Sequence, residues 1–95
     1  MYASIRRYKT SSAAEVTRRV KEVFVLPRIS YVPGFLAFYV IDTGEGVLAF
    51  VSVFETKEGE EESNKVAADW QKEAVSGLLG PVEITAGEVV FHEAK

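Results

Sequence analysis

The segment FLAFYVIDTGEGVLAFVSVFE, Phe35–Glu55, constrains the fold more than any other part of the chain. Two runs rich in aromatic and β-branched residues, Phe35–Asp42 and Val47–Glu55, flank the turn sequence TGEG, which predicts a β-hairpin. Both faces of each strand are apolar, so both faces of the resulting sheet need a cover. A chain of 95 residues builds only a modest core of its own. One face is therefore left for a partner molecule unless the rest of the chain can cover both.

The residues before the hairpin predict a strand followed by a helix. Tyr2–Lys9 is a short strand of mixed polarity, and Ser12–Glu15 (SAAE) matches a capping box at a helix start. Apolar residues then recur at helical spacing: Val16, Val20, Val23 and Phe24. Pro27 ends or kinks this helix.

The residues after the hairpin predict a second helix and a last strand. Thr56 can cap the helix, and the glutamates of Glu58–Glu62 fit a solvated first turn, where the helix dipole favours negative charge. The buried stripe consists of Val66, Ala67, Trp70, Ala74, Val75 and Leu78. The sequence GLLGP, Gly77–Pro81, stops the helix, and Val82–Glu93 forms the final strand, with Gly87 as a bulge or bend.

The order β-α-β-β-α-β places the chain in the α+β class as a ferredoxin-like fold, a four-stranded antiparallel sheet with two helices on one face. Without a linker, repeat or low-complexity segment, residues 1–95 form a single domain. The two helices can cover one face of the sheet, and no element remains for the other.

The register of the hairpin predicts which face stays open. If Asp42 lies opposite Val47, one face carries the pairs Phe35–Phe54, Ala37–Ser52, Tyr39–Phe50 and Ile41–Leu48. The more aliphatic opposite face carries Leu36, Phe38, Val40, Val47, Ala49, Val51 and Val53. We expect the aliphatic face to pack on the helices and the aromatic face to stay open. Tyr2, Ser4, Arg6 and Tyr8 of the first strand are assigned to the aromatic face by composition.

An open aromatic face predicts a homodimer. Soluble monomers expose apolar patches of only a few hundred Å², and each aromatic side chain can bury about 150–250 Å². At about 25 cal/mol per Å², covering such a face stabilises an assembly by an amount on the order of 10 kcal/mol before association costs. Two copies packed sheet against sheet would provide that cover and enclose a pocket for a small apolar or aromatic ligand.

Composition excludes several classes of protein. The chain has no cysteine, so it has neither disulfides nor cysteine-ligated zinc or iron–sulfur sites. The start MYASIRRYKTSS lacks a signal-peptide core, and no apolar run reaches the length of about 18–20 residues that spans a membrane, which favours a cytoplasmic protein. Basic residues are concentrated before residue 29, but on a predicted strand and helix rather than a tail, which disfavours nucleic-acid binding.

The sequence resembles a known group of proteins. PGF before the second strand, VSVFETKEGEEESNKVAADW and the order of elements resemble the dimeric α+β barrel superfamily, and most closely its antibiotic biosynthesis monooxygenase-like domains. The resemblance covers almost the whole chain. It implies homodimers whose sheets close into a barrel with an internal cavity. Some members oxidise polycyclic aromatic compounds without metal or flavin, others degrade haem, and many have no known activity.

The same resemblance separates two branches. The haem-degrading branch uses an asparagine on the first strand and a tryptophan and a histidine on or near the second helix. Arg6, Ser63 and Glu73 stand at the matching positions here, which disfavours haem and leaves no expected cofactor or metal. The aromatic-oxidising branch holds a phenol and its anion with polar and aromatic side chains.

The candidate site follows from these types of residue. The candidate catalytic residues are His92 and Arg6, and the candidate ligand-binding residues are Tyr8, Tyr39, Phe50, Ser52, Asn64 and Trp70. Histidine is the residue type best suited to general-base chemistry at neutral pH, so His92 could act as a general base, or it is simply exposed near the chain end. The position of Trp70 on the apolar stripe of the second helix favours core packing over ligand stacking, whereas Tyr8 and Tyr39 could equally bind a ligand or fill the core. The resulting hypothesis is a cofactor-independent monooxygenase for a small aromatic or quinone-like compound. The alternative is a non-catalytic ligand-binding or dimerisation module.

Overall fold

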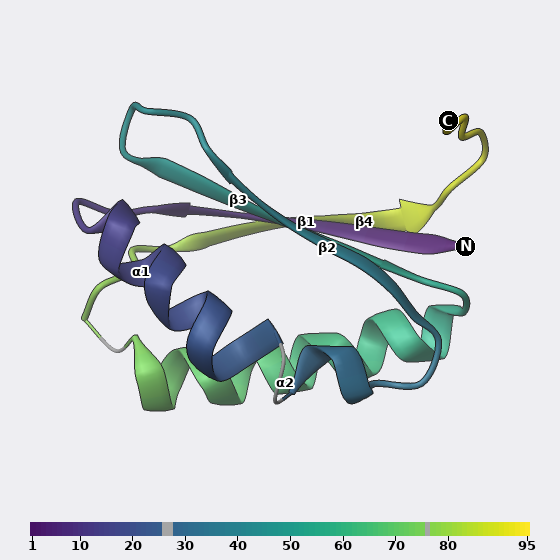
Figure 1. Cartoon of the computed structure of the whole chain (residues 1–95), viewed down its shortest axis with the longest axis horizontal. Helices are drawn as coiled ribbons and strands as arrows, with labels where there is room; N and C mark the ends of the chain where they lie inside the picture. Colours follow the sequence, from purple (N-terminus) through teal and green to yellow (C-terminus); the bar gives the residue numbers. More distant parts are fainter. Residues whose placement is uncertain (26–27, 76) are drawn as a thin grey trace.

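The computed structural model describes residues 1–25, 28–75 and 77–95 and has the predicted order of elements. The elements are β1 (Tyr2–Lys9), α1 (Ala13–Arg19), η1 (Val20–Val25), η2 (Ile29–Tyr31), β2 (Phe35–Asp42), β3 (Val47–Phe54), α2 (Lys57–Ala74) and β4 (Val82–Glu88). The strands form one antiparallel sheet in the order β2-β3-β1-β4, and both long helical segments lie on the same side of it (Figure 1). The predicted ferredoxin-like fold is confirmed.

The register of the β2–β3 hairpin differs from the prediction by one residue. Asp42 pairs with Leu48 rather than Val47, and the shift persists until a bulge between Phe35 and Ala37. Val47 is used by the turn, because its carbonyl oxygen accepts from the backbone N–H of Thr43 at 3.2 Å and from the Thr43 hydroxyl at 3.0 Å. A shift of one residue moves the side chains of one strand to the other face relative to its partner.

The shift corrects the assignment of the faces. The face that contacts the helices, here called the covered face, carries Ser4, Arg6, Tyr8, Phe38, Val40, Leu48, Phe50, Ser52 and Phe54. The opposite, open face carries Ile5, Arg7, Ala37, Tyr39, Ile41, Ala49, Val51, Val53 and Thr85. The grouping of the first strand with Phe50 and Ser52 is confirmed, but that set is buried under the helices. The open face is mainly aliphatic rather than aromatic.

The covered face and the helices share one core. Its largest fully buried side chains include those of Trp70, Phe54, Ile29 and Leu48, and Phe35 packs against Phe54 with ring centroids 5.9 Å apart. The prediction that Trp70 packs in the core is therefore confirmed. The predictions for the side chains of Val23, Phe24 and Ala74, and for Pro27, lie outside the described residues.

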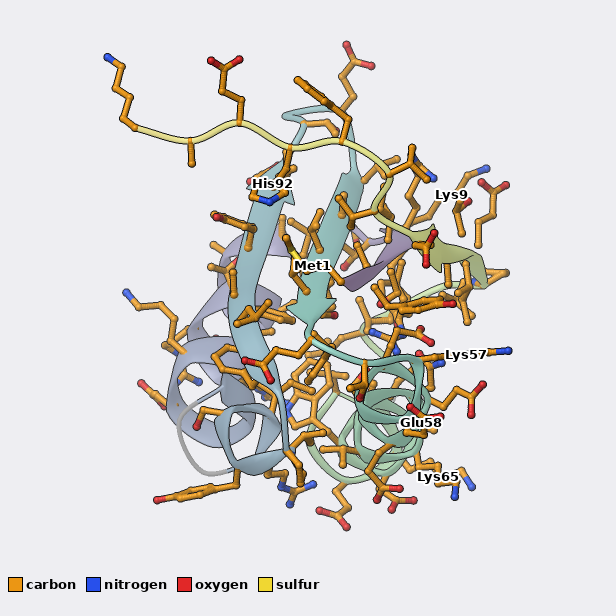
Figure 2. All side chains as sticks on the ribbon, turned by 90° about the vertical axis from the view of Figure 1, so that its right-hand side faces the viewer. Met1, Lys9, Lys57, Glu58, Lys65 and His92 are labelled. Atoms are coloured by element: carbon orange, nitrogen blue, oxygen red, sulfur yellow. The ribbon has the colours of Figure 1, made fainter. Side chains whose placement is uncertain are left out.

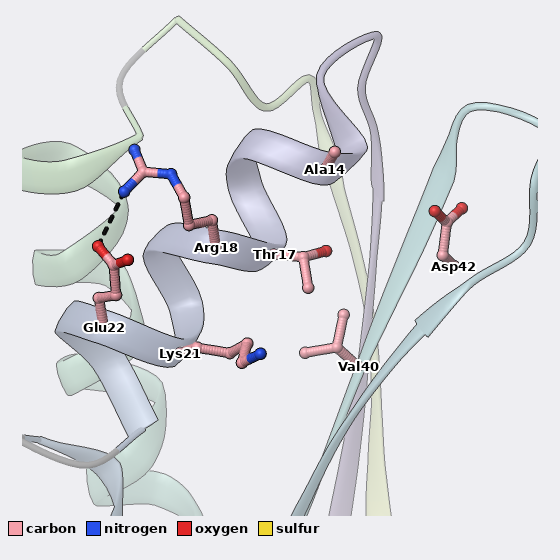
Figure 3. A pocket seen from close by; sticks show the side chains of 7 residues that line it. All are labelled: Ala14, Thr17, Arg18, Lys21, Glu22, Val40 and Asp42. Carbon is pink, nitrogen blue, oxygen red and sulfur yellow. Dashed lines mark hydrogen bonds and ion pairs between the residues drawn. The ribbon is translucent and has the colours of Figure 1, made fainter.

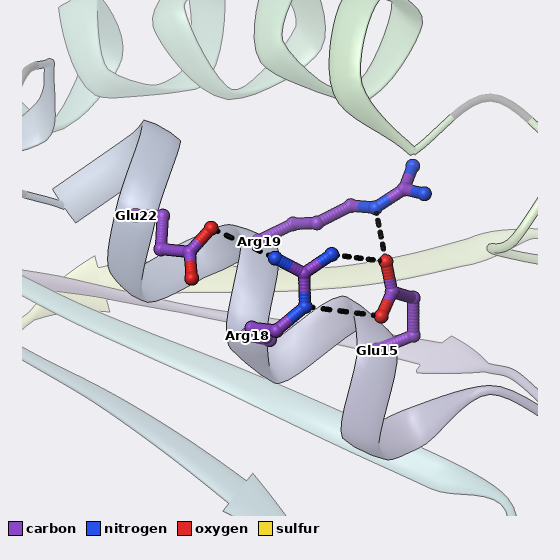
Figure 4. Close-up of polar contacts among 4 residues, drawn as sticks. All are labelled: Glu15, Arg18, Arg19 and Glu22. Carbon is purple, nitrogen blue, oxygen red and sulfur yellow. Dashed lines mark hydrogen bonds and ion pairs between the residues drawn. The ribbon is translucent and has the colours of Figure 1, made fainter.

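The start of α1 differs from the predicted capping box. Ser12 precedes the helix, but its side chain makes no capping hydrogen bond. The Glu15 carboxylate instead accepts hydrogen bonds from Arg18 at 2.6 Å and Arg19 at 2.8 Å, and Arg18 also reaches Glu22 at 2.8 Å (Figure 4). Charge pairs on the helix surface thus compete for the glutamate that the capping box needs.

This charge network predicts a pH-dependent stability. The hydrogen bonds from Arg18 and then Arg19 lower the pKa of Glu15 from 4.5 to about 2. A lowered pKa in the folded state contributes stability above pH 4.5, and that contribution is lost as the pH falls towards about 2. The difference in unfolding free energy between wild type and Glu15→Gln, measured by urea denaturation, should therefore shrink across this window. It should also be smaller in high salt because the groups are exposed. A difference independent of both pH and salt would contradict this role.

The start of α2 follows the prediction. The Thr56 side chain accepts a hydrogen bond from the Gly59 backbone N–H at 3.1 Å and caps the helix. At the other end of the chain, β4 stops at Glu88 rather than Glu93, and Gly87 pairs regularly with Ala3, so the predicted bulge is wrong. In the part of the chain that is described, no helix is long and apolar enough to cross a membrane.

Gly59 gives a second prediction. Glycine inside a helix normally costs about 1 kcal/mol relative to alanine. A Cβ at Gly59, however, would lie 2.7 Å from the Pro33 carbonyl oxygen and 3.3 Å from Cδ1 of Phe54. Gly59→Ala should therefore lower the unfolding free energy by about 1–3 kcal/mol in urea denaturation, as overpacking does. The exposed substitution Glu61→Ala is the matched control on the same helix. Stabilisation by Gly59→Ala would show that the Pro33 segment moves away.

Candidate functional site

Alternate residues of β1 bring polar groups under the helices. Ser4 and Arg6 point to the covered face, where they lie opposite Ser52 and Phe50 of β3. Both serines are fully buried, and their hydroxyl oxygens lie 3.3 Å apart. Arg6 is only 3% exposed. Burying a guanidinium is costly unless the charge has a use or a partner, so its surroundings define the candidate site.

Aromatic rings surround this position. Phe50, directly opposite Arg6, lies 5.2 Å from Tyr8, 5.9 Å from Phe38 and 6.1 Å from Trp70, measured between ring centroids. Trp70 comes from α2, whereas the other rings come from the sheet. The arrangement joins a buried positive charge to an aromatic cluster, which suits a flat ligand with a polar substituent.

Arg6 and Tyr8 influence each other's charge. Burial lowers the pKa of the Arg6 guanidinium, while Tyr8 and the negative charge of Glu60 act in the opposite direction. Burial raises the pKa of Tyr8, and the charge of Arg6 partly offsets this. Within the described ranges, the Nη2 atom of Arg6 is buried and makes no hydrogen bond. A buried N–H group of a cation is therefore available to an acceptor.

Glu60 is a member of this site that the sequence interpretation missed. The glutamates of Glu58–Glu62 were expected at a solvated helix start, but Glu60 is only 5% exposed. Its Oε1 atom accepts a hydrogen bond from Nδ2 of Asn64 at 3.1 Å. The signal was present in the spacing, because Glu60, Ser63, Ala67 and Trp70 follow each other at intervals of three or four residues and all face inward.

The edge strand β4 leaves apolar side chains exposed next to Arg6. On β4, Ile84 lies opposite Arg6 and Val82 lies opposite Tyr8, so both point to the covered face. Ile84 is nevertheless 54% exposed and Val82 is also exposed, because the helices do not reach this edge strand. A cavity of about 350 Å³ at the same end of the sheet is lined by Arg7, Lys9, Val47 and Glu83 as well as Tyr8, so it lies towards the open face rather than beside Arg6. The apolar side chains of β4 next to the buried Arg6 are thus exposed at this edge of the covered face.

The structure brings together most, but not all, of the predicted site residues. Arg6, Tyr8, Phe50, Ser52, Asn64 and Trp70 come from β1, β3 and α2 and lie between the sheet and α2. Tyr39 points to the open face instead and is 58% exposed. His92 follows β4 in the exposed C-terminal segment, on the side of the sheet away from the helices (Figures 1 and 2). Of the candidate residues, Tyr39 and His92 therefore do not lie beside Arg6 within this subunit.

A larger cavity, of about 450 Å³, lies between α1 and β2 (Figure 3). Its wall includes Thr17, Lys21 and Val40, and it contains none of the predicted site residues. Arg18, which also lines this cavity, forms an ion pair with Glu22. Among the residues described, no group of three or more His, Cys, Asp or Glu side chains could hold a metal ion.

Sequence comparisons do not identify a family for this chain. No protein-family model matches it. No curated protein matches it in sequence either.

Comparison with solved structures identifies the fold. A dimeric ferredoxin-like protein from an uncultured marine organism has a TM-score of 0.75 and 15% identity, covering 99% of this chain and 98% of that one. The haem-degrader MhuD of Mycobacterium tuberculosis, solved with two haems in its active site, has a TM-score of 0.74 and 19% identity, covering 99% and 100%. The monooxygenase ActVA-Orf6 of Streptomyces coelicolor, solved with nanaomycin D, has a TM-score of 0.73 and 16% identity, covering 99% and 91%. The chain therefore has the ferredoxin-like fold of the antibiotic biosynthesis monooxygenase-like proteins.

Proposed function

We propose that this protein is a homodimeric α+β barrel protein that binds a small aromatic phenol or quinone-like compound and oxidises it with dioxygen, without a cofactor. The buried guanidinium of Arg6 is the observation that carries the proposal. A positive charge that is 3% exposed among aromatic rings lowers stability, so the fold retains it at a cost. Its free Nη2 donor in the described structure suits a phenolate oxygen.

The chemistry follows from stabilising that oxygen. An electron-rich phenolate can transfer electrons to dioxygen, which phenol itself does poorly. In a monooxygenation, one oxygen atom enters the ring, the ring carbon and hydroxyl lose their hydrogens, and the second oxygen atom leaves as water with both hydrogens. Dioxygen is thus both the oxidant and the oxygen source. Arg6 would favour the anion, and the rings of Phe50 and Trp70 would hold the aromatic plane and exclude water.

The open face supports the homodimer. Tyr39 and Ile41 are exposed there next to half-buried Ile5 and Val51, although none of the described helices lies on this side of the sheet (Figure 1). An apolar sheet face of this kind is seldom left in water. A second copy of the chain supplies the same apolar face with two-fold symmetry, so a sheet-to-sheet dimer covers both. The dimeric ferredoxin-like neighbour supports this assembly.

Haem is a less suitable ligand for this chain than for the haem-degrading neighbour. Glu73, at the position where the resemblance places a histidine, forms an ion pair with Arg28. Ser63 is buried and donates its hydroxyl to the Glu60 carbonyl oxygen at 2.6 Å. The single histidine of the chain, His92, lies in the exposed C-terminal segment.

A second candidate function is a non-catalytic binding or dimerisation module. The observation that favours it is the close contact of Phe50 with three other rings, which fill much of the space beside Arg6. Dioxygen consumption, recorded with an oxygen electrode while 1-naphthol is present, separates the two functions when calorimetry is run on the same sample. Binding with protein-dependent oxygen uptake supports the enzyme. Binding without uptake supports a ligand carrier, and the absence of both supports a dimerisation module.

A further inference from the structure

Glu60 fixes the orientation of the Asn64 side chain. A carboxylate can only accept hydrogen bonds, so the 3.1 Å contact with Glu60 Oε1 must come from the amide nitrogen of Asn64. The amide oxygen, Oδ1, is then turned away from Glu60. This oxygen is buried and accepts no hydrogen bond from the part of the chain that is described. Without Glu60, the amide could rotate and present either of its ends.

The site therefore contains a buried acceptor as well as a buried donor. Arg6 Nη2 is a donor without a described acceptor, and Asn64 Oδ1 is an acceptor without a described donor. Glu60 links the two residues, because it holds Asn64 and its charge acts on Arg6. A ligand that satisfies both must accept from the guanidinium and donate to the amide oxygen. The neutral hydroxyl group of a bound phenol does both, whereas an ether, a quinone carbonyl or the phenolate that forms only during turnover can accept but not donate.

We propose that Glu60 is a positioning residue that, by orienting Asn64, makes the site select ligands with a hydrogen-bond donor, that is, hydroxylated aromatic compounds over their ethers and quinones. This inference rests on the proposed function, because it concerns the ligand of the same site. It has a consequence for turnover. Oxidation of a phenol to a quinone removes the hydroxyl hydrogen, so the product would bind more weakly than the substrate and leave the site.

Two probes of nearly the same shape test the selection. 1-Naphthol accepts and donates a hydrogen bond, whereas 1-methoxynaphthalene only accepts. Leaving a buried acceptor unpaired weakens binding by roughly tenfold, so the wild-type dissociation constant should be about tenfold lower for 1-naphthol. Isothermal titration calorimetry on the purified full chain measures both constants. The ratio of the two constants is the readout, because a general loss of stability would weaken both ligands alike.

Three variants assign the effect to Glu60. Glu60→Leu, which frees the Asn64 amide, and Asn64→Leu, which removes the acceptor, should each bring the ratio close to one. Glu60→Gln keeps an oxygen that can accept from Asn64 and should retain part of the preference. Glu58→Gln changes an exposed glutamate that projects from the same end of α2 and should keep the wild-type ratio (Figure 2). Circular dichroism confirms folding. If Glu60→Leu does not fold, Asn64→Leu and Glu60→Gln decide the outcome.

The outcomes separate this inference from the proposed function. If neither probe binds the wild type, the proposed ligand site is wrong and the inference fails with it. If both probes bind equally well, or if the preference survives in Glu60→Leu and Asn64→Leu, the ligand site stands and the role of Glu60 is overturned. A preference that is lost in both leucine variants and kept in Glu58→Gln supports the inference.

Discussion

Arg6→Met is expected to leave the protein at least as stable as the wild type while abolishing the binding of 1-naphthol. Burial disfavours the charged guanidinium, as its lowered pKa indicates, and Glu60 compensates only in part. Methionine fills a similar volume and packs well against Phe50 and Tyr8. Replacing buried charges by apolar residues is often neutral or stabilising by about 1–4 kcal/mol. Urea denaturation should therefore show an unchanged or higher midpoint, and calorimetry should show at least about a hundredfold weaker binding of 1-naphthol.

The neighbouring arginine provides the control. Arg7 lies on the same strand but points to the open face and is exposed. Arg7→Met should bind 1-naphthol with the wild-type dissociation constant. A large loss of stability in Arg6→Met would show that the guanidinium is a structural group satisfied inside the fold, and undiminished binding would show that the ligand lies elsewhere. Either result removes the main support for the proposed enzyme.

Tyr39→Glu is expected to convert a homodimer into monomers. Tyr39 points to the open face, opposite Val51 of the central strand β3. A carboxylate buried in an apolar interface costs several kcal/mol, and two-fold symmetry places two of them in one dimer. The dissociation constant of the dimer should rise on the order of a thousandfold or more. Sedimentation velocity at micromolar concentration should show a dimer for the wild type and a monomer or an unfolded chain for the variant.

A matched surface substitution distinguishes the interface from a general effect of charge. Ala68 is exposed on α2, on the helical layer of the molecule. Ala68→Glu should leave the wild-type dimer intact. A wild-type monomer that stays folded at micromolar concentration would refute the sheet-to-sheet dimer, and a dimer that persists in Tyr39→Glu would place the interface on another surface.

The sequence predicted the fold because its strongest signals are local. The run of β-branched and aromatic residues predicted β2 with the same bounds that the structure shows. Thr56 predicted the cap of α2. The register of the hairpin was beyond such reasoning. Whether Val47 begins the paired strand or completes the turn depends on hydrogen bonds to Thr43, and both faces of β3 are apolar enough to accept either register. Apolar alternation alone therefore could not tell the open face from the covered one.

The sequence predicted most of the residues of the candidate site, whereas the tertiary structure decided how they are arranged. The sequence selected Arg6, Tyr8 and Asn64, and these lie together because β1 pairs with β3 beneath α2. Two residues were misassigned because their positions depend on contacts between distant parts of the chain. Glu60 was predicted to be exposed, but the packing of α2 on the sheet buries it. Tyr39 was predicted to line the pocket, but the register of the hairpin places it on the open face. The sequence by itself thus determined the elements and their order, since these follow from local propensity and periodicity. Only the tertiary structure decided which charges are buried and which face is open, because a shift of one residue or a rotation of one helix changes both.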